Sequence, residues 1–364
     1  MSKAAQLAAL IGSGQAQGDK NLIINGAMQV AQRGTSLTGQ GASSIFLLDR
    51  FRMNTNGASA GRYTITQTAD GPSGLANCLK LDVTTADTSI AAGERLFIEH
   101  PFEGQNLQSI AKGTSDAQSL TLSFYVKGNA AATYVAGFYD NDNNRQVSKQ
   151  FAVTTSWNRI TLTFPPDTAG VLGDDNALSM QLRFYLHAGS NYTSGTISET
   201  WIAADGTKSV GSGTTSIFDS TNRTFFITGV QLEIGETATP FEHEDIGTTL
   251  EKCQRYYVKL LSDTAYDTYG PGIAYVTTQF YATLRTPTRL RGNPTIGSSG
   301  NFAAMANGSH HATDAAPAYN RALVDGMTVE VYFDMTTNNL VAGHACQLRN
   351  NNDADAYIEI IAEL

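Results

Sequence analysis

The sequence is poor in cysteine and in long apolar runs, and each shortage excludes a class of protein. Its three cysteines, Cys78, Cys253 and Cys346, are odd in number and far apart, so we expect buried free thiols rather than a disulfide framework. This suits assembly in a reducing cytoplasm. No window approaches the length of a membrane span, and residues 4–11 are too short to predict a signal peptide.

Charge is also scarce. Only 16% of the residues are charged, and the formal net charge is −9. Binding to phosphates needs clustered Lys and Arg, and no basic stripe occurs, so a nucleic-acid partner is not expected. Serine, threonine, asparagine and glutamine are abundant instead, which indicates surfaces that meet other sheets or neutral ligands such as sugars.

Motifs of catalysis are missing as well. The chain holds no G-x-S-x-G, H-E-x-x-H, P-loop or G-x-G-x-x-G pattern. Glu242, Glu244 and Asp245 are close in sequence, but acids at the start of a helix are explained by capping and by the helix dipole. We therefore expect no enzyme and no cofactor.

Two groups of possible metal ligands do not fit known metal sites. Asp140, Asp142 and Asn144 alternate like the start of a calcium loop, yet the glycine and the glutamate that an EF-hand requires are absent, so a hairpin turn is predicted. The spacing of the histidines His310, His311 and His344 with Cys346 matches no closed zinc site. A metal held by histidines around a threefold axis stays open, by analogy alone.

What the chain does contain is typical of an all-β protein. It has 34 glycines, 15 tyrosines and 16 phenylalanines, and its 364 residues predict two domains. Short strand-like segments separated by turn residues run from residue 21 to residue 234, with no amphipathic helix among them, which predicts a sandwich or barrel. Residues 21–30 are expected to form the first strand, and Trp157 is expected to plug the core.

Residues 224–257 are expected to close the first domain and to connect it to the second. Residues 224–234 predict a strand inside a sheet, with Phe226, Thr228 and Val230 on one face and Phe225 and Ile227 on the other. A short helix follows at 244–258, for which Thr248 and Glu251 fit a capping box. This helix links the first domain, 21–243, to a second β domain at 259–364.

The first twenty residues predict a short helix ending near Gly12. Leu7, Leu10 and Ile11 form a narrow apolar stripe, too short to be stable alone in water. It is either a frayed terminus or a peptide that folds on a partner, and we favour the second interpretation because the flexible tether after it would let an anchor orient freely.

Several motifs resemble those of a known group. NLIINGAMQVAQRG with DRF, then QLEIG, TPFEH and CQRYY, are similar to segments of bacteriophage tail-fibre and other virion surface proteins. The pairing of an NLIINGAM-like start with an FFITGVQLE-like end resembles the family 4/9 carbohydrate-binding jelly rolls. The resemblance covers about two-thirds of the chain.

The resemblance implies a jelly-roll β-sandwich followed by a second, smaller β-sandwich. It further implies a non-enzymatic virion protein, made in the host cytoplasm, that mediates host attachment through surface polysaccharide as a tail fibre. The N-terminal peptide would attach it to a tail or capsid protein, and the C-terminal domain would supply homotrimer contacts or the tip. A capsid-bound fibre or decoration protein and a polysaccharide depolymerase are the alternatives. Family members often hold a structural calcium, but Gln29 and Thr228 stand near its ligand positions here.

A sugar site needs an aromatic platform beside amide and carboxylate groups. The long Gly/Ser/Thr-rich excursion 192–220 offers Trp201 and Tyr192 as the platform, with Asn191, Asp205 and Lys208 near them. Packing of Trp201 against its own loop or a subunit interface is the equal alternative. Four tyrosines alternate within strands and are expected to be core or sheet-face residues: Tyr63, Tyr125, Tyr139 and Tyr185.

Overall fold

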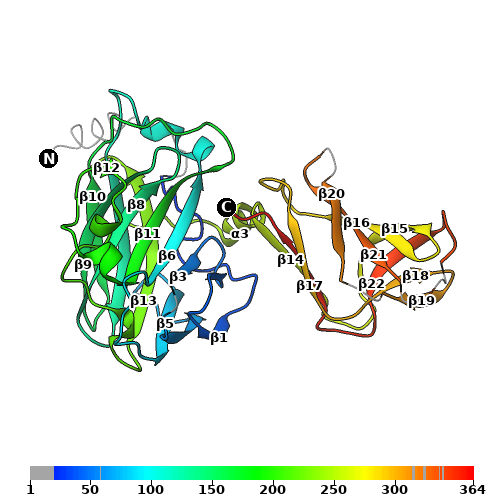
Figure 1. Ribbon diagram of the computed structural model, residues 1–364. Helices are drawn as coiled ribbons and strands as arrows, with labels where there is room; N and C mark the ends of the chain where they lie inside the picture. The colour runs from blue at the N-terminus through cyan, green and yellow to red at the C-terminus, as the bar shows by residue number, and fades with distance from the viewer. Residues whose placement is uncertain (1–19, 58, 314–315, 323–324, 336, 338–339) are drawn as a thin grey trace. The chain divides into compact units, whose positions relative to one another are not determined.

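The computed structural model describes residues 20–364 except 58, 314–315, 323–324, 336 and 338–339. The predicted N-terminal helix and its stripe of Leu7, Leu10 and Ile11 lie outside the described residues. The chain divides into two compact units (Figure 1). Unit 1 comprises the described part of Met1–Met28 with Thr38–Ser44 and Met53–His243, and unit 2 comprises Gln29–Leu37, Ile45–Arg52 and Glu244–Leu364.

Unit 1 is a β-sandwich of two antiparallel sheets, as predicted. The β13 sheet has the strand order β1-β4-β5-β13-β7-β10, and the β11 sheet has the order β12-β9-β8-β11-β6-β3-β2. The chain passes from one sheet to the other repeatedly, as in a jelly roll. The strands are β1 (Ser36–Gln40), β2 (Ile45–Phe46), β3 (Arg52–Asn56), β4 (Arg62–Thr68), β5 (Cys78–Thr85), β6 (Arg95–Glu103), β7 (Leu120–Gly128), β8 (Ala132–Asp140), β9 (Arg145–Val153), β10 (Asn158–Phe164), β11 (Leu178–Ala188), β12 (Ile202–Ala203) and β13 (Thr224–Ile234).

Aromatic side chains join the two sheets. Phe124 of β7 meets Phe151 of β9 and Phe184 of β11 edge to face, with ring centroids 5.0 Å apart in both pairs. Such T-shaped pairs are favourable beyond the area that they bury. Trp157, by contrast, does not plug this core: its ring is partly exposed and contacts the partly buried Phe226. That prediction is wrong because Trp157 precedes β10 in a turn.

Strand β13 has the predicted bounds and lies between β5 and β7, inside its sheet. The predicted alternation of its faces fails halfway. Gly229 has φ +59, and the register with β7 shifts between Thr228 and Gln231. This bulge inverts the pattern, so that Phe225 and Ile227 before it and Val230 after it are all fully buried.

Residues 21–30 form turns rather than the predicted first strand. Asn25 and Met28 have φ of 61° and 56°, in the left-handed region, where a residue other than glycine does not continue a strand. The segment nevertheless lies beside the closing strand, because the Leu22 N–H donates to Leu232 O at 3.0 Å and the Val230 N–H to Gly26 O at 2.9 Å.

The motifs that carry the virion-protein resemblance in unit 1 contact one another. The Asn21 backbone N–H donates to Glu242 at 2.9 Å, and its side-chain oxygen accepts from Leu232 N at 3.0 Å. The Gln231 side chain accepts from Glu242 N at 2.7 Å, and Glu233 accepts from Thr239 N at 3.0 Å. These motifs therefore close the sandwich, and their contacts are structural.

The predicted linker helix is α3 (Ile246–Gln254), and β14 begins at Tyr257. Its cap is Asp245, whose side chain accepts from Gly247 N at 2.8 Å, so the predicted capping box at Thr248 and Glu251 is wrong by one turn. Glu244 bonds Lys252. The capping explanation of the acids before this helix is thus correct for Asp245.

Unit 2 is a smaller β-sandwich. Its β23 sheet has the order β14-β23-β17, and its β16 sheet has the order β19-β18-β22-β15-β16-β21-β20. Side chains of both sheets share one core. The strands are β14 (Tyr257–Leu261), β15 (Thr268–Val276), β16 (Gln279–Arg285), β17 (Thr295–Ser299), β18 (Phe302–Ala306), β19 (Ser309–Ala312), β20 (Ala318–Ala322), β21 (Thr328–Asp334), β22 (Ala345–Asn350) and β23 (Tyr357–Ile361).

Two early segments belong to unit 2, although the predicted first domain ran from 21 to 243. Arg33 lies 3.5 Å over the ring of Tyr257, and Arg50 lies 3.5 Å over the ring of Tyr256. Both guanidinium groups reach Glu363, at 3.1 and 2.6 Å. These partly buried cation–π and ionic contacts fix Gln29–Leu37 and Ile45–Arg52 on this unit.

Cys78, Cys253 and Cys346 are free and buried, as expected. Burial raises the pKa of the Cys78 and Cys346 thiols to about 11, which keeps them protonated and unreactive. Within the described residues, no helix has the length and hydrophobicity required to cross a membrane.

Candidate functional site

The outward face of the β11 sheet in unit 1 carries polar and aromatic side chains in neighbouring rows. Leu182 and Phe184 of strand β11 are fully buried in the sandwich. Gln181, Arg183 and Tyr185 point to the opposite face, where Arg183 is partly exposed and Gln181 and Tyr185 are buried, at 7% and 5% exposure. We call Asn54, Glu99, Tyr139, Gln181 and Arg183 the sheet face; Asn54, Tyr139 and Arg183 are its partly exposed members, and Glu99 is buried among them at 1% exposure.

Arg183 is held between aromatic rings on this face. Its guanidinium carbon lies 4.1 Å from the ring centroid of Tyr139 and 5.1 Å from that of Phe97. Its Nε donates to Gln181 Oε1 at 2.9 Å, and Nη1 donates to Tyr185 Oη at 3.3 Å. Because stacking and hydrogen bonds both orient the planar guanidinium, it is a rigid group on an aromatic support.

Further polar groups flank this stack. Glu99 on β6 lies opposite Arg183 in the sheet register and accepts from Asn54 Nδ2 at 3.1 Å. Tyr139 pairs with Gln181, and its hydroxyl donates to Asn144. Amide, carboxylate, guanidinium and phenol groups thus stand at fixed positions beside the faces of aromatic rings.

The loops between β11 and β13 cover one end of this face. Phe97, Val135 and Tyr185 of the sheet form a buried cluster with Val210 from the loop. Tyr192 packs on this cluster, with the Arg95 guanidinium 4.8 Å from its ring centroid. The aromatic character of the sheet face therefore continues into the loop.

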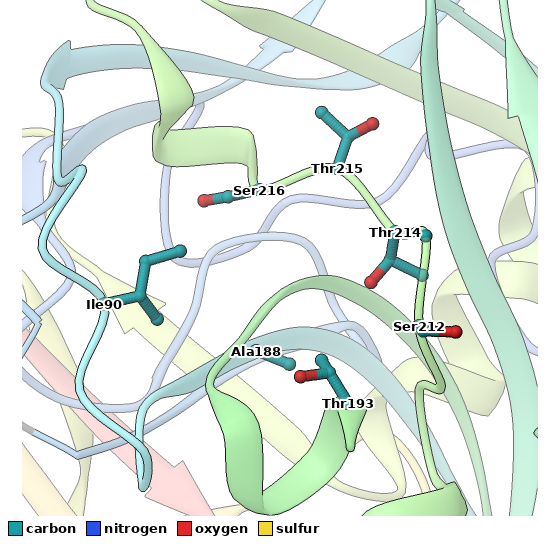
Figure 2. Close-up of a pocket in the computed structure, with 8 residues that line it drawn as sticks. Ile90, Ala188, Thr193, Ser212, Thr214, Thr215 and Ser216 are labelled. Carbon is teal, nitrogen blue, oxygen red and sulfur yellow. The ribbon is translucent and has the colours of Figure 1, made fainter. Parts of the chain in front are cut away.

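A pocket of about 270 Å³ lies among these loops (Figure 2). We call it the loop pocket, and its lining residues are Ile90, Ala188, Thr193, Ser212, Gly213, Thr214, Thr215 and Ser216.

All five predicted sugar-site residues lie between β11 and β13, and the charged groups of Asp205 and Lys208 contact each other. Asp205 caps the turn η3 (Gly206–Lys208), accepting from Thr207 N at 3.1 Å, and lies 3.3 Å from Lys208 Nζ. Helix α2 (Ser190–Thr193) carries Asn191 and Tyr192; its backbone packs against η3, since a Cβ on Gly206 would lie 3.3 Å from Asn191 O. Their predicted role in sugar binding stays a prediction.

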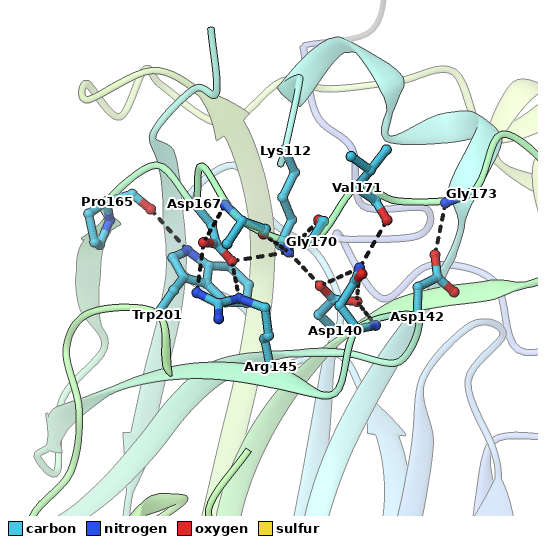
Figure 3. Close-up of polar contacts among 12 residues, drawn as sticks. Lys112, Asp140, Asp142, Arg145, Pro165, Asp167, Gly170, Val171, Gly173 and Trp201 are labelled. Atoms are coloured by element: carbon cyan, nitrogen blue, oxygen red, sulfur yellow. Dashed lines mark hydrogen bonds and ion pairs between the residues drawn. The ribbon is translucent and has the colours of Figure 1, made fainter. Parts of the chain in front are cut away.

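Trp201, directly before β12, lies beside Pro165 and Lys112 (Figure 3). Its indole Nε1 donates to Pro165 O at 3.0 Å, and its ring stacks at 6.5 Å on Phe138, a buried core residue. Lys112 Nζ lies 5.0 Å from the ring. The indole N–H is thus engaged in an internal hydrogen bond and one part of the ring packs on Phe138, contacts of the kind expected if Trp201 packs within the protein rather than against a sugar.

The buried Lys112 is the centre of an ionic network at the same edge (Figure 3). Its Nζ forms an ion pair with Asp140 and lies 3.1 Å from the carboxylate of Asp167. Arg145 donates two hydrogen bonds to the same Asp167 carboxylate, from Nε at 2.8 Å and from Nη2 at 2.9 Å. Burial acts to raise the pKa of Asp167, but the hydrogen bonds from Arg145 and Lys112 outweigh it and hold this pKa below its usual value. The network joins loop 165–173 to the end of β8.

The predicted hairpin turn at residues 141–144 joins β8 to β9, and Asn144 has a left-handed φ of 52°. Asp140 is engaged by Lys112 and by Asn143, and Asp142 accepts from Gly173 N at 2.9 Å. Among the described side chains, no three His, Cys, Asp or Glu residues are grouped to hold a metal ion.

Sequence reasoning missed Arg183, Gln181 and Glu99. The signal is the sequence of β11, LSMQLRFYLHA, in which the polar Gln181 and Arg183 alternate with the apolar Met180, Leu182 and Phe184. Of the tyrosines expected to be core or sheet-face residues, Tyr63 is fully buried in the core, Tyr185 is buried under the loops, and Tyr139 is partly exposed on the sheet. The rows that join them across strands depend on register, which the sequence does not display.

No protein-family model matches the chain, and no curated protein matches it in sequence. Solved structures that resemble it include one described as CBM4, a carbohydrate-binding module, at 13% identity and a TM-score of 0.30, covering 58% of this chain and 99% of that one. The enzymatically active domain of bacteriophage CBA120 tailspike protein 4 has 13% identity and a TM-score of 0.29, with coverage of 59% and 21%. A family 11 carbohydrate-binding module from Clostridium thermocellum, in complex with a mixed-linked tetrasaccharide, has 11% identity and a TM-score of 0.29, covering 57% and 99%. At these values the likeness identifies no ligand for this chain.

Proposed function

We propose that this protein binds carbohydrate through the sheet face of unit 1 and performs no catalysis. The observation that carries the proposal is the partly exposed Arg183 guanidinium, which stacks on the partly exposed ring of Tyr139 and on the buried ring of Phe97. The buried Gln181 holds it in place. A sugar ring offers apolar C–H faces and a rim of hydroxyl groups. Aromatic surfaces with a few fixed polar groups suit such a ligand.

The preorganisation of Arg183 supports this function. Gln181 and Tyr185 fix the guanidinium before any ligand arrives, so less rotamer entropy is lost when its remaining N–H groups donate to a ligand. The non-enzymatic part is supported by the engagement of nearby acids: Asp140 and Asp167 are tied to Lys112, and Glu99 accepts from Asn54.

We further propose that the protein is a virion component, a tail fibre or receptor-binding protein that attaches to host surface polysaccharide. The resemblance of the NLIING, QLEIG and TPFEH motifs to virion surface proteins supports this role, together with low charge and hydroxyl-rich surfaces. A capsid-bound fibre or decoration protein would use the same modules. Cross-linking of residues 1–20 in intact particles distinguishes tail from capsid.

Self-association, expected as a homotrimer, is proposed to use unit 2. Four large apolar side chains near one end of β15 are 40–65% exposed: Ile273, Tyr275, Val276 and Val341. Apolar patches of this kind commonly mark interaction surfaces.

The test of carbohydrate binding is affinity electrophoresis of the purified protein in gels that contain host surface polysaccharide. Arg183→Ala should weaken retention by at least about tenfold, or about 1.4 kcal/mol. Arg183→Lys should weaken it similarly, because lysine keeps the charge and loses the planar fork. Arg321→Ala, an exposed arginine of unit 2, is the matched control. Equal retention of Arg183→Ala and Arg321→Ala would contradict the proposal.

A further inference from the structure

The loop pocket has the chemistry of a small neutral site. None of its eight lining residues is charged, and five of them carry hydroxyl groups. Its volume of about 270 Å³ lies just below the roughly 300–1,000 Å³ of pockets that enclose drug-sized ligands. A group the size of one sugar ring suits this volume better than a chain does.

Its hydroxyl groups are oriented by the backbone. Thr193 Oγ1 donates to Gly189 O at 3.3 Å, and Thr214 Oγ1 donates to Gly211 O at 3.4 Å. A hydroxyl group that donates one hydrogen bond still has lone pairs with which it can accept another. Figure 2 shows Ile90 on one side of the space and Thr193 and Thr214 across from it, so an apolar wall faces an accepting wall.

A buried histidine fixes the pocket wall from behind. His187 Nδ1 lies 2.8 Å from Ser216 Oγ, and Nε2 lies 3.2 Å from Glu94. Ser216 also accepts from Phe218 N at 3.0 Å, which caps the turn η4 (Ile217–Asp219). The wall therefore exists before a ligand binds, which lowers the entropy cost of binding.

The loop pocket is also continuous with the sheet face. Ala188 lines the pocket and packs on the cluster that contains Tyr185 and Phe97. Tyr185 accepts from Arg183, and Phe97 lies under the same guanidinium. One strand, β11, thus carries the sheet face and leads to the pocket at its end.

We propose that the loop pocket takes one neutral sugar unit, a branch or a chain end of the glycan that the sheet face holds. This inference rests on the proposed function for the polymer, but the pocket binds the single unit by itself. Thr193 and Thr214 accept from the ligand's hydroxyl groups, and Ile90 covers a C–H face. A uronic acid is excluded, because its carboxylate would lose hydration with no cation in the pocket lining.

The experiment is saturation-transfer NMR of the full chain with the methyl glycosides of glucose, galactose, mannose and N-acetylglucosamine, and with methyl glucuronide. At least one neutral glycoside should bind, and the glucuronide should not. Ile90→Trp should raise the Kd of that glycoside by about tenfold or more, because indole fills the pocket. Thr214→Val, which keeps the shape and removes the acceptor, should raise it about threefold or more.

The controls separate this inference from the proposed function. Val171→Trp places the same ring on another exposed site of unit 1 and should leave the Kd unchanged. Absence of binding by every neutral glycoside, equal binding of the glucuronide, or an unchanged Kd in Ile90→Trp would overturn the pocket assignment. Loss of polysaccharide retention in Arg183→Ala would still support the sheet face.

Discussion

The outward sheet faces of the two units differ in how their polar side chains are used. On the β11 sheet of unit 1, Arg183 donates hydrogen bonds to Gln181 and Tyr185, and these bonds fix its guanidinium over an aromatic ring. On the β16 sheet of unit 2, polar groups pair with one another. These pairs are Gln279 with Asp334 at 2.8 Å, Arg349 with Gln347 at 2.8 Å, and Arg321 with Glu330 at 3.0 Å.

The apolar side chains of the two units differ in their exposure. Phe97 and Tyr185 are buried beneath the loops of unit 1, whereas Tyr275 and Ile273 of unit 2 are 65% and 50% exposed. Tyr281 links Tyr275, at 5.3 Å, to Tyr332 on the next strand, at 6.0 Å. A face with oriented polar groups suits a hydroxylated ligand, and a face with exposed apolar groups and self-satisfied polar ones suits burial against protein.

The ionic network around Lys112, at the end of β8, gives the largest expected effect. Lys112→Met leaves the buried Asp140 without its cation, which should lower the unfolding free energy of unit 1 by about 3–5 kcal/mol. Urea unfolding followed by tryptophan fluorescence reads unit 1 alone, because Trp157 and Trp201 are the two tryptophans of the chain and both lie there.

Lys149→Met is the matched control, since Lys149 pairs with the largely exposed Glu199 and should contribute at most about 1 kcal/mol. A loss below about 1 kcal/mol for Lys112→Met would show that the network does not support the β8–β9 hairpin that carries Tyr139.

A substitution in the exposed apolar patch of unit 2 should weaken self-association without changing the unfolding free energy. Tyr275→Lys puts a charge into the exposed apolar patch and should raise the dissociation constant of the proposed oligomer at least about tenfold. The unfolding free energy should stay within about 0.5 kcal/mol, as for most exposed positions. Light scattering after size exclusion measures the mass. Val171→Lys, exposed in unit 1, is the control, and an equal effect of both variants would break the comparison.

Acid should weaken unit 1 through Asp167. Its pKa is held below the usual value in the folded state, so its contribution is present above the unfolded pKa of about 3.9 and is lost as pH falls through the folded pKa. We expect tryptophan-detected stability to fall below about pH 4, and Asp167→Asn to flatten that dependence. The same slope in both proteins would assign the acid sensitivity to other carboxylates.

The fold was largely predictable from local pattern, as the bounds of β13 show. Two features were not. The bulge at Gly229 and the left-handed Asn25 depend on hydrogen bonds from residues some two hundred positions away, such as Asn21 with Leu232. Periodicity within one segment contains no information about these partners.

The candidate site was only partly predictable, for a related reason. Trp201 is prominent in the sequence because tryptophan is rare there, yet its place is set by Pro165 and Phe138. Arg183 is inconspicuous in the sequence, and its stack depends on Tyr139, which only the sheet register brings beside it.

The most direct test of carbohydrate binding by unit 1 is hydroxyl-radical footprinting of the tyrosines, read by mass spectrometry. The protein is labelled with and without the host polysaccharide that retains it in affinity electrophoresis. Binding at the sheet face predicts that oxidation of Tyr139 falls while oxidation of Tyr275 is unchanged. Protection of Tyr275 with Tyr139 unaffected would contradict it.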